Sequence, residues 1–148
     1  MNADLFRTVM VPIANPNDAQ ETARAVRAYL GSDSEIIVTH VVPKGEGVPD
    51  KASVAQREDF AKDAYEKFLN VLAADADRIT PLTLYGRDVA NTSVGGAREA
   101  NATAIVFTPQ GAGRWVKLIA GSVSEALIRN STIPMLVLPP REQNEPLE

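Results

Sequence analysis

The hydrophobic positions of this chain form short continuous runs that alternate with longer segments of helical spacing. Short, mostly apolar runs bounded by turn residues are typical of buried strands. Such runs are found at Thr8–Ile13, Ile36–Val42, Thr83–Tyr85, Thr103–Phe107 and Ile133–Leu138. The pattern therefore predicts five strands.

The segments between these runs carry apolar residues every three or four positions, which is the spacing of one helix face. We expect helices over 19–30, over 53–77, after a capping Asp88, and over 122–129. Gly95 and Gly96 weaken the third of these predictions, because glycine is a poor helix former. The turn-rich segment 15–18 separates the first strand from its helix, and 43–51 is expected to be a loop.

The strands are apolar throughout rather than alternating, so both faces of their sheet must be covered. Strands that alternate with helices and are buried on both faces predict a parallel, doubly wound α/β sheet. No internal repeat or linker divides the chain. We expect one Rossmann-like domain over residues 1–140, followed by a loose polar tail over 141–148.

The composition excludes several functional classes. The 148 residues include no cysteine and one histidine, so thiol chemistry, zinc–cysteine sites and multi-histidine metal sites are ruled out. Nineteen acidic residues against fifteen basic ones give a net charge of -4, which argues against broad binding to nucleic acid or anionic membranes. No run is long enough to span a membrane, and the N-terminus lacks a secretory pattern, so we expect a cytoplasmic protein.

Candidate chemistry gathers after the fourth strand. Ligands of open α/β sheets bind at the carboxyl ends of the strands, where the strand order switches. Here Gly111 and Gly113 precede Arg114 and Lys117, and Gly121-Ser122 opens the next predicted helix. Free N–H groups at a helix start bind phosphate well. A capping box formed by Ser122 and Glu125, together with ordinary turn glycines, explains the same residues without any ligand.

These residues resemble the universal stress protein family, whose ATP-binding members carry Gly-x2-Gly-x9-Gly-Ser/Thr after the fourth strand. Gly111, nine intervening residues and Gly121-Ser122 match the second half of that motif. Further likeness lies in Gly121-Ser-Val-Ser-Glu125, in Pro134-Met-Leu-Val-Leu138, in Thr39-His-Val-Val42 and in Gly86-Arg-Asp-Val-Ala90. The resemblance covers nearly the whole chain, and it implies a sheet of order 3-2-1-4-5, as in the adenine nucleotide alpha hydrolase-like fold.

The resemblance implies a non-catalytic protein that binds ATP, with Mg²⁺, in a stress-response or regulatory role. Phosphate contacts would come from Gly111, Gly121, Ser122 and Val123, and a backbone contact to adenine from Val41. The full set of expected site residues is Pro12, Ile13, Ala14, Val41, Phe107, Thr108, Gly111, Arg114, Gly121, Ser122 and Val123.

The chain departs from the family's ATP-binding pattern at two positions. Thr108 stands where the pattern has its first glycine, and Ala14 stands where the ATP-binding members tend to place an aspartate. Both departures favour an alternative, a dimeric interaction module of the same family that works without a nucleotide. An enzyme is not expected, because the first strand is followed by Ala14-Asn-Pro-Asn17 and not by a Ser-Gly-Gly-x-Asp-Ser loop.

The sequence also predicts roles for one edge strand and for two single residues. The apolar edge strand Ile133–Leu138 would be covered by pairing with its copy in a homodimer, as the resemblance also implies. His40, a lone histidine in an apolar strand, is expected to be a hydrogen-bonded core or pocket-rim residue. Trp115 is expected to pack on the protein and not on a ligand.

Overall fold

The computed structural model describes residues 4–31, 33–43, 51–108, 129 and 131–138. Its strands are β1 (Thr8–Pro12), β2 (Glu35–Pro43), β3 (Ile79–Gly86), β4 (Ala104–Phe107) and β5 (Met135–Val137). Its helices are α1 (Pro16–Tyr29), α2 (Lys51–Val71) and α3 (Val89–Glu99), with a 3₁₀ segment η1 (Ala73–Arg78). All strand pairs are parallel and the sheet order is β3-β2-β1-β4-β5, which confirms the predicted fold and topology.

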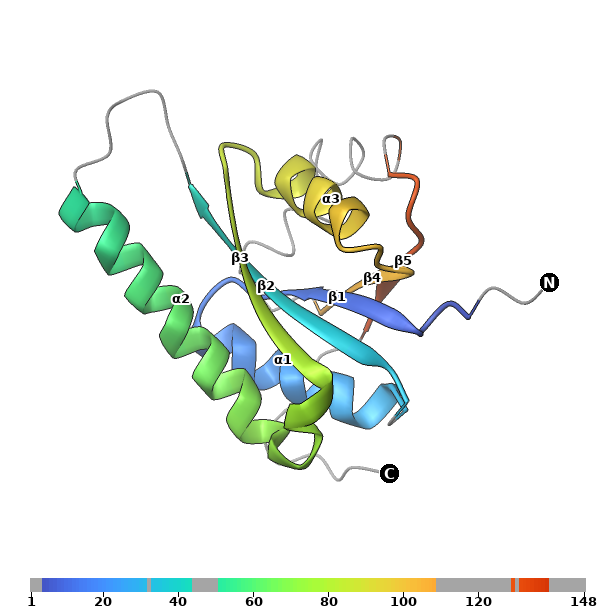
Figure 1. Cartoon of the computed structure of the whole chain (residues 1–148). Coiled ribbons are helices and arrows are strands. Elements are labelled where there is room, and N and C mark those ends of the chain that lie inside the picture. Colours follow the sequence, from blue (N-terminus) through green and yellow to red (C-terminus); the bar gives the residue numbers. More distant parts are fainter. Residues whose placement is uncertain (1–3, 32, 44–50, 109–128, 130, 139–148) are drawn as a thin grey trace.

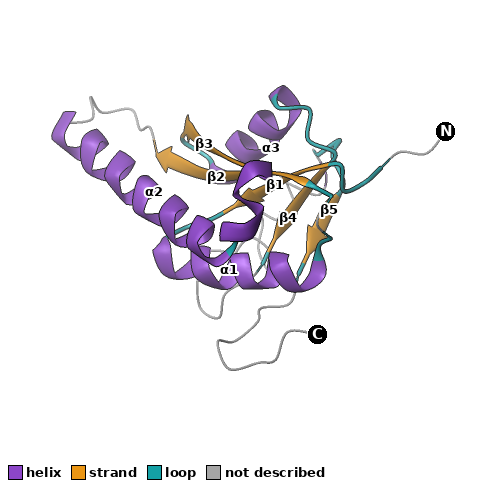
Figure 2. Cartoon of the chain, turned by 60° about the horizontal axis from the view of Figure 1, so that its bottom comes forward, coloured by secondary structure: helices purple, strands orange, loops and turns teal. Residues whose placement is uncertain are grey.

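Helices cover both faces of the sheet (Figures 1 and 2). α1 and α2 pack on one face over a core that includes Val9, Val11 and Phe68. α3 packs on the other face over a smaller core that includes Met10 and Ile105. Val9 and Met10 are neighbours in β1 and point to opposite faces, so a strand in this position has to be apolar at every residue.

Helix α1 begins earlier than the sequence pattern predicts. The segment 15–18 was expected to be a turn, but Asn15 is the N-cap of α1 and Pro16 is its first residue. The Asn15 side chain accepts a hydrogen bond from the backbone N–H of Asp18, at 2.8 Å. Proline is favoured at the first helical position, because its missing N–H has no partner there in any case.

The second helix ends earlier than predicted, and the third strand is longer. α2 stops at Val71 and is followed by η1, whereas a helix was expected to run to Asp77. β3 then starts at Ile79 and includes Pro81, whereas only Thr83–Tyr85 was expected to be a strand. Proline is tolerated here because β3 is an edge strand and need not donate a hydrogen bond on its outer side.

Two other predictions for elements need correction or fall outside the described residues. β5 covers Met135–Val137, which is shorter than the predicted Ile133–Leu138. The predicted helix over 122–129 lies outside the described residues except for Arg129, and so does most of the loop predicted over 43–51.

The glycines of α3 do not interrupt it, and one of them has a packing reason. Ala90, Val94 and Ala97 are buried against the sheet. A Cβ atom on Gly96 would lie 2.7 Å from a methyl carbon of Leu84 in β3. Glycine therefore lets α3 approach the edge of the sheet closely, which offsets its low helix propensity.

The inward side of α2 includes Ala64 and Phe68, and Leu72 follows the helix; all three are buried. Phe60 has the same helical spacing, but 45% of its surface is exposed. Among the described residues, no helix is long and apolar enough to cross a membrane.

The contrast between the two phenylalanines of α2 gives a stability test. Phe68 has no exposed surface, so Phe68→Ala should lower the free energy of unfolding by about 3–5 kcal/mol through lost burial and a residual cavity. Phe60→Ala makes the same change on the same helix at an exposed position, and it should cost about 1 kcal/mol or less. Urea denaturation of both variants measures the difference; equal losses would contradict this packing.

Candidate functional site

The candidate site lies at the carboxyl ends of the strands, where the strand order reverses between β1 and β4. From β1 the chain proceeds to β2 and β3 on one side, and it returns to β4 and β5 on the other. In doubly wound sheets, ligands bind outside the carboxyl ends of the strands at such a switch point. β1 and β4 lie side by side as paired parallel strands.

The structure brings together those predicted site residues that it describes. Pro12, Ile13 and Ala14 form the end of β1 and the turn after it, Val41 lies near the end of β2, and β4 ends at Phe107, before Thr108. The Ile13 backbone N–H donates to the Thr39 carbonyl at 2.8 Å and extends the β1–β2 ladder by one residue.

These residues offer little side-chain surface in the described part of the chain. The exposed fraction is 2% for Ile13, 9% for Ala14, 5% for Val41 and 1% for Thr108. Apolar side chains and main-chain groups therefore dominate this edge of the first two strands. The other predicted site residues, Gly111, Arg114, Gly121, Ser122 and Val123, lie outside the described residues, as does Trp115.

A buried carboxylate closes the turn between β1 and α1, and sequence reasoning missed it. Asp18 is 4% exposed. Its Oδ2 accepts the Ala14 backbone N–H at 2.6 Å, and its Oδ1 accepts the Thr22 hydroxyl at 3.2 Å. An acceptor that is charged strengthens such bonds, and an anion is also favoured in the first turn of a helix.

The signal for this role was present in the spacing of Asn15 and Asp18. An acidic residue three positions after an N-cap can reach back to a backbone N–H, as in a capping box. Asp18 reaches one residue further back than that motif does, to Ala14. The Ala14 N–H is therefore occupied by the protein itself, and the turn is held in one conformation.

His40 ties β2 to the end of β1. Its Nδ1 lies 3.0 Å from the carbonyl oxygen of Ile13, and the residue is 6% exposed. Because a carbonyl oxygen can only accept, Nδ1 carries the proton in this bond. The imidazole packs against the ring of Phe60 of α2 in a T-shaped arrangement, with 5.9 Å between ring centroids. The prediction of a hydrogen-bonded, buried histidine is confirmed.

Two tyrosines lie on the same side of the sheet, between α2 and β3. The hydroxyl of Tyr65 is 2.9 Å from the Thr83 hydroxyl, and burial raises the pKa of the Tyr65 phenol. Tyr85 donates to Glu58 at 2.8 Å, and this hydrogen bond to a carboxylate raises the pKa of Tyr85. Both pKa values are raised further above neutral pH. Both phenols therefore keep their protons at pH 7, and neither suits the role of a general base.

The described residues contain no group of three or more His, Asp or Glu side chains that could hold a metal ion. An open cavity of about 620 Å³ lies elsewhere, between β3 and α3, lined by Leu82, Leu84, Thr92 and Gly95 among others. It sits at the β3 edge of the sheet and not at the β1–β4 switch point.

The model of the universal stress protein family matches residues 5–139, which is almost the whole chain. This chain belongs to the universal stress protein family. No curated protein matches it significantly. The family membership confirms the resemblance found from the glycine motif and the strand-end segments.

Solved structures show the same fold at low sequence identity. UspA from Lactobacillus plantarum is 18% identical, with a TM-score of 0.70 over 93% of this chain and 99% of that one. A universal stress protein from Archaeoglobus fulgidus is 21% identical, with a TM-score of 0.61 over 90% and 93%. A universal stress protein solved in complex with cAMP is 19% identical, with a TM-score of 0.61 over 90% and 97%.

The turn closed by Asp18 can be tested by removing its charge. We expect Asp18→Asn to lower the free energy of unfolding by about 1.5–3 kcal/mol, because charge-assisted bonds to Ala14 and Thr22 are lost in a buried setting. Asp63→Asn is a matched control on the exposed face of α2 and should change stability by about 0.5 kcal/mol or less. Equal effects in chemical denaturation would show that Asp18 does not hold the turn.

Proposed function

We propose that this protein binds an adenine nucleotide, with ATP and Mg²⁺ as the first choice, at the carboxyl edge between β1 and β4. The observation that carries the proposal is the convergence of Ile13, Ala14, Val41 and Thr108 on the point where the strand order reverses. Ligands of doubly wound sheets bind at such a point. A family member of the same fold has been solved with a cyclic adenine nucleotide, cAMP.

The chemistry of the described edge suits a base better than a phosphate. Main-chain groups at Ile13 and Val41, whose side chains are almost fully buried, can contact a flat, weakly polar ring. The phosphates would be held by Gly111, Gly121, Ser122 and Val123, with Arg114 as a counter-charge. Backbone N–H groups at a helix start, together with an arginine, are a suitable environment for them.

We propose that the nucleotide is bound without efficient turnover, in a stress-response or regulatory role. Two titratable groups near the end of β1 are engaged in hydrogen bonds within the protein. Asp18 accepts bonds from Ala14 and Thr22, and His40 contacts the Ile13 carbonyl. A group with these contacts is poorly placed to activate a water molecule. A cytoplasmic location remains a prediction from the sequence.

The alternative is a nucleotide-independent interaction module. It is favoured by the turn after β1, where Ala14 brings no carboxylate and its N–H is already bonded to Asp18. A ligand gains little from this residue beyond contact with a methyl group. The two proposals differ in one measurable property, the affinity for ATP.

Calorimetric titration of nucleotide-stripped protein with ATP and Mg²⁺ distinguishes them. We expect micromolar binding, which Gly121→Val should weaken by about a hundredfold or more, because a side chain there would block the phosphates. Gly95→Val is a matched control, since a Cβ atom at Gly95 would meet no atom within 4 Å. An absence of heat at millimolar ATP, with the protein folded, would contradict nucleotide binding and favour the interaction module.

We also propose a homodimer formed through Ile133–Leu138, with β5 paired to its copy. Among the described residues β5 has one neighbouring strand, β4, and Val137 on this edge is 46% exposed. Pairing of identical edges about a twofold axis would cover it. Light scattering at micromolar concentration should give twice the monomer mass, and Val137→Lys should shift it toward the monomer. A monomer mass for the unmodified protein would reject the dimer.

A further inference from the structure

A second, smaller cavity lies at the end of the sheet opposite the carboxyl ends of the strands, where α1 ends and β2 begins. Its volume is about 130 Å³. One part of its lining is apolar and comes from Val26 of α1, from Leu30 just after this helix, from Ile36 of β2, and from Leu72. α1 starts after β1, has 14 residues and spans roughly 21 Å, so this cavity is separated from the turn after β1 by the length of that helix.

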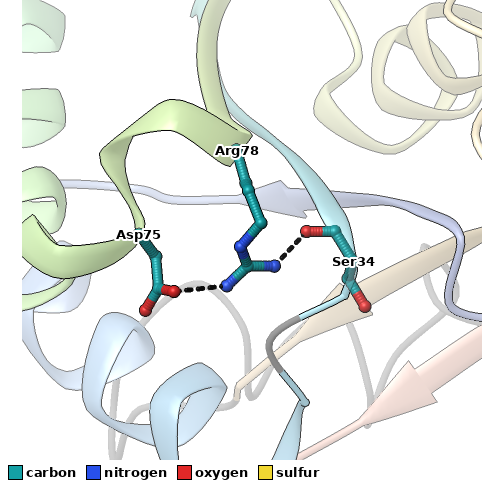
Figure 3. A network of polar contacts seen from close by, with 3 residues as sticks. All are labelled: Ser34, Asp75 and Arg78. Atoms are coloured by element: carbon teal, nitrogen blue, oxygen red, sulfur yellow. Dashed lines mark hydrogen bonds and ion pairs between the residues drawn. The ribbon is translucent and has the colours of Figure 1, made fainter.

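The other part of the lining is charged. Arg78, at the end of η1, points between two acceptors, as Figure 3 shows. It donates to the Ser34 carbonyl and, at 2.7 Å, to Oδ1 of Asp75. The Arg78 side chain is 20% exposed and that of Asp75 is 30% exposed. The ion pair fixes the Arg78 guanidinium at the cavity and balances its charge.

Arg27 of α1 brings a second guanidinium to the same cavity, and this charge is not balanced by an acid. Its Nη1 donates to the Val71 carbonyl at 3.1 Å, which holds the group across the gap between α1 and α2. Within the part of the chain that the structure describes, the salt bridge at this cavity joins Arg78 and Asp75, and no carboxylate lies within 4.0 Å of Arg27. The cavity therefore carries a surplus of one positive charge.

The size of the cavity limits what it can hold. About 130 Å³ is close to the size of a cavity of about 150 Å³ that holds one benzene molecule, so a nucleotide does not fit. A free inorganic anion would lose part of its hydration against Val26, Leu30, Ile36 and Leu72 without replacement. A molecule with one anionic end and a short hydrocarbon chain matches both parts of the lining.

We propose that this cavity binds a short aliphatic carboxylate, with its chain against the apolar wall and its carboxylate on Arg27. A guanidinium presents paired N–H groups whose geometry matches the two oxygens of a carboxylate. Arg78 adds positive potential beside them, while Asp75 restricts the site to a single anionic group. The site is independent of the nucleotide proposal, because it uses none of the same residues.

Pentanoate is a suitable probe, titrated into the full-length ¹⁵N-labelled protein and followed by NMR. We expect saturable shifts of the amides of Leu30, Gly31 and Ile36, with a dissociation constant on the order of 1 mM. Arg27→Gln should weaken binding about tenfold or more, because it removes the charge and the fork but keeps similar bulk. Arg24→Gln is the matched control: it removes the same charge from α1 outside the cavity lining and should stay within about twofold.

Two further probes separate the contributions of the charge and the chain. 1-Pentanol keeps the chain without the charge, and inorganic phosphate keeps charge without the chain; each should bind at least about fivefold more weakly than pentanoate. Thermal unfolding of both arginine variants verifies that they are folded. The proposal is overturned by an absence of saturable shifts up to about 50 mM pentanoate, by unchanged affinity in Arg27→Gln, or by phosphate binding as tightly as pentanoate.

Discussion

The burial of β1 on both faces is the constraint on which the rest of the structure depends. Val9, Met10 and Val11 have no exposed surface, and β1 pairs in parallel with β2 on one side and β4 on the other. A strand in this position has to be covered by helices above and below, because neither face can meet water. The placement of α1 and α2 on one face and α3 on the other follows from this requirement. The strand order reverses at β1, and this switch point is where we propose that a nucleotide binds.

Polar contacts then fix the end of this apolar strand. Asp18 holds the turn after β1 through the Ala14 N–H, and His40 contacts the Ile13 carbonyl from β2. Backbone groups at the end of a central strand would otherwise need water or a ligand as partners. Here the protein itself supplies partners for two such groups, the Ala14 N–H and the Ile13 carbonyl. The two titratable groups that make these contacts, Asp18 and His40, hold the main chain at the end of β1.

The sequence predicts the central part of the fold better than its edges. β1, β2 and β4 are recognisable because buried strands are apolar at every position, whereas the edge strand β3 contains Pro81 and exposed residues and was predicted too short. Phe60 has helical spacing with the core residues of α2, yet 45% of its surface is exposed and its ring contacts that of His40. Spacing assigns a helix face, but the neighbouring elements decide how far along the helix that face is covered.

The candidate site shows the same limit. Strand order and the glycine motif indicate where to look, because the carboxyl ends of parallel strands meet at one edge. The role of Asp18 depends on how far the chain turns after β1, and the cavity at Arg27 and Arg78 depends on segments far apart in sequence. Contacts between distant segments are set by tertiary packing, which local patterns do not encode.

The most direct test of the nucleotide-binding account is an NMR titration of the labelled protein with ATP and Mg²⁺. The account predicts saturable shifts at Ile13, Ala14, Val41 and Thr108, with the amides of β3 unchanged. Shifts centred on the cavity between β3 and α3, near Leu82 and Gly95, or an absence of shifts at millimolar ATP, would contradict it.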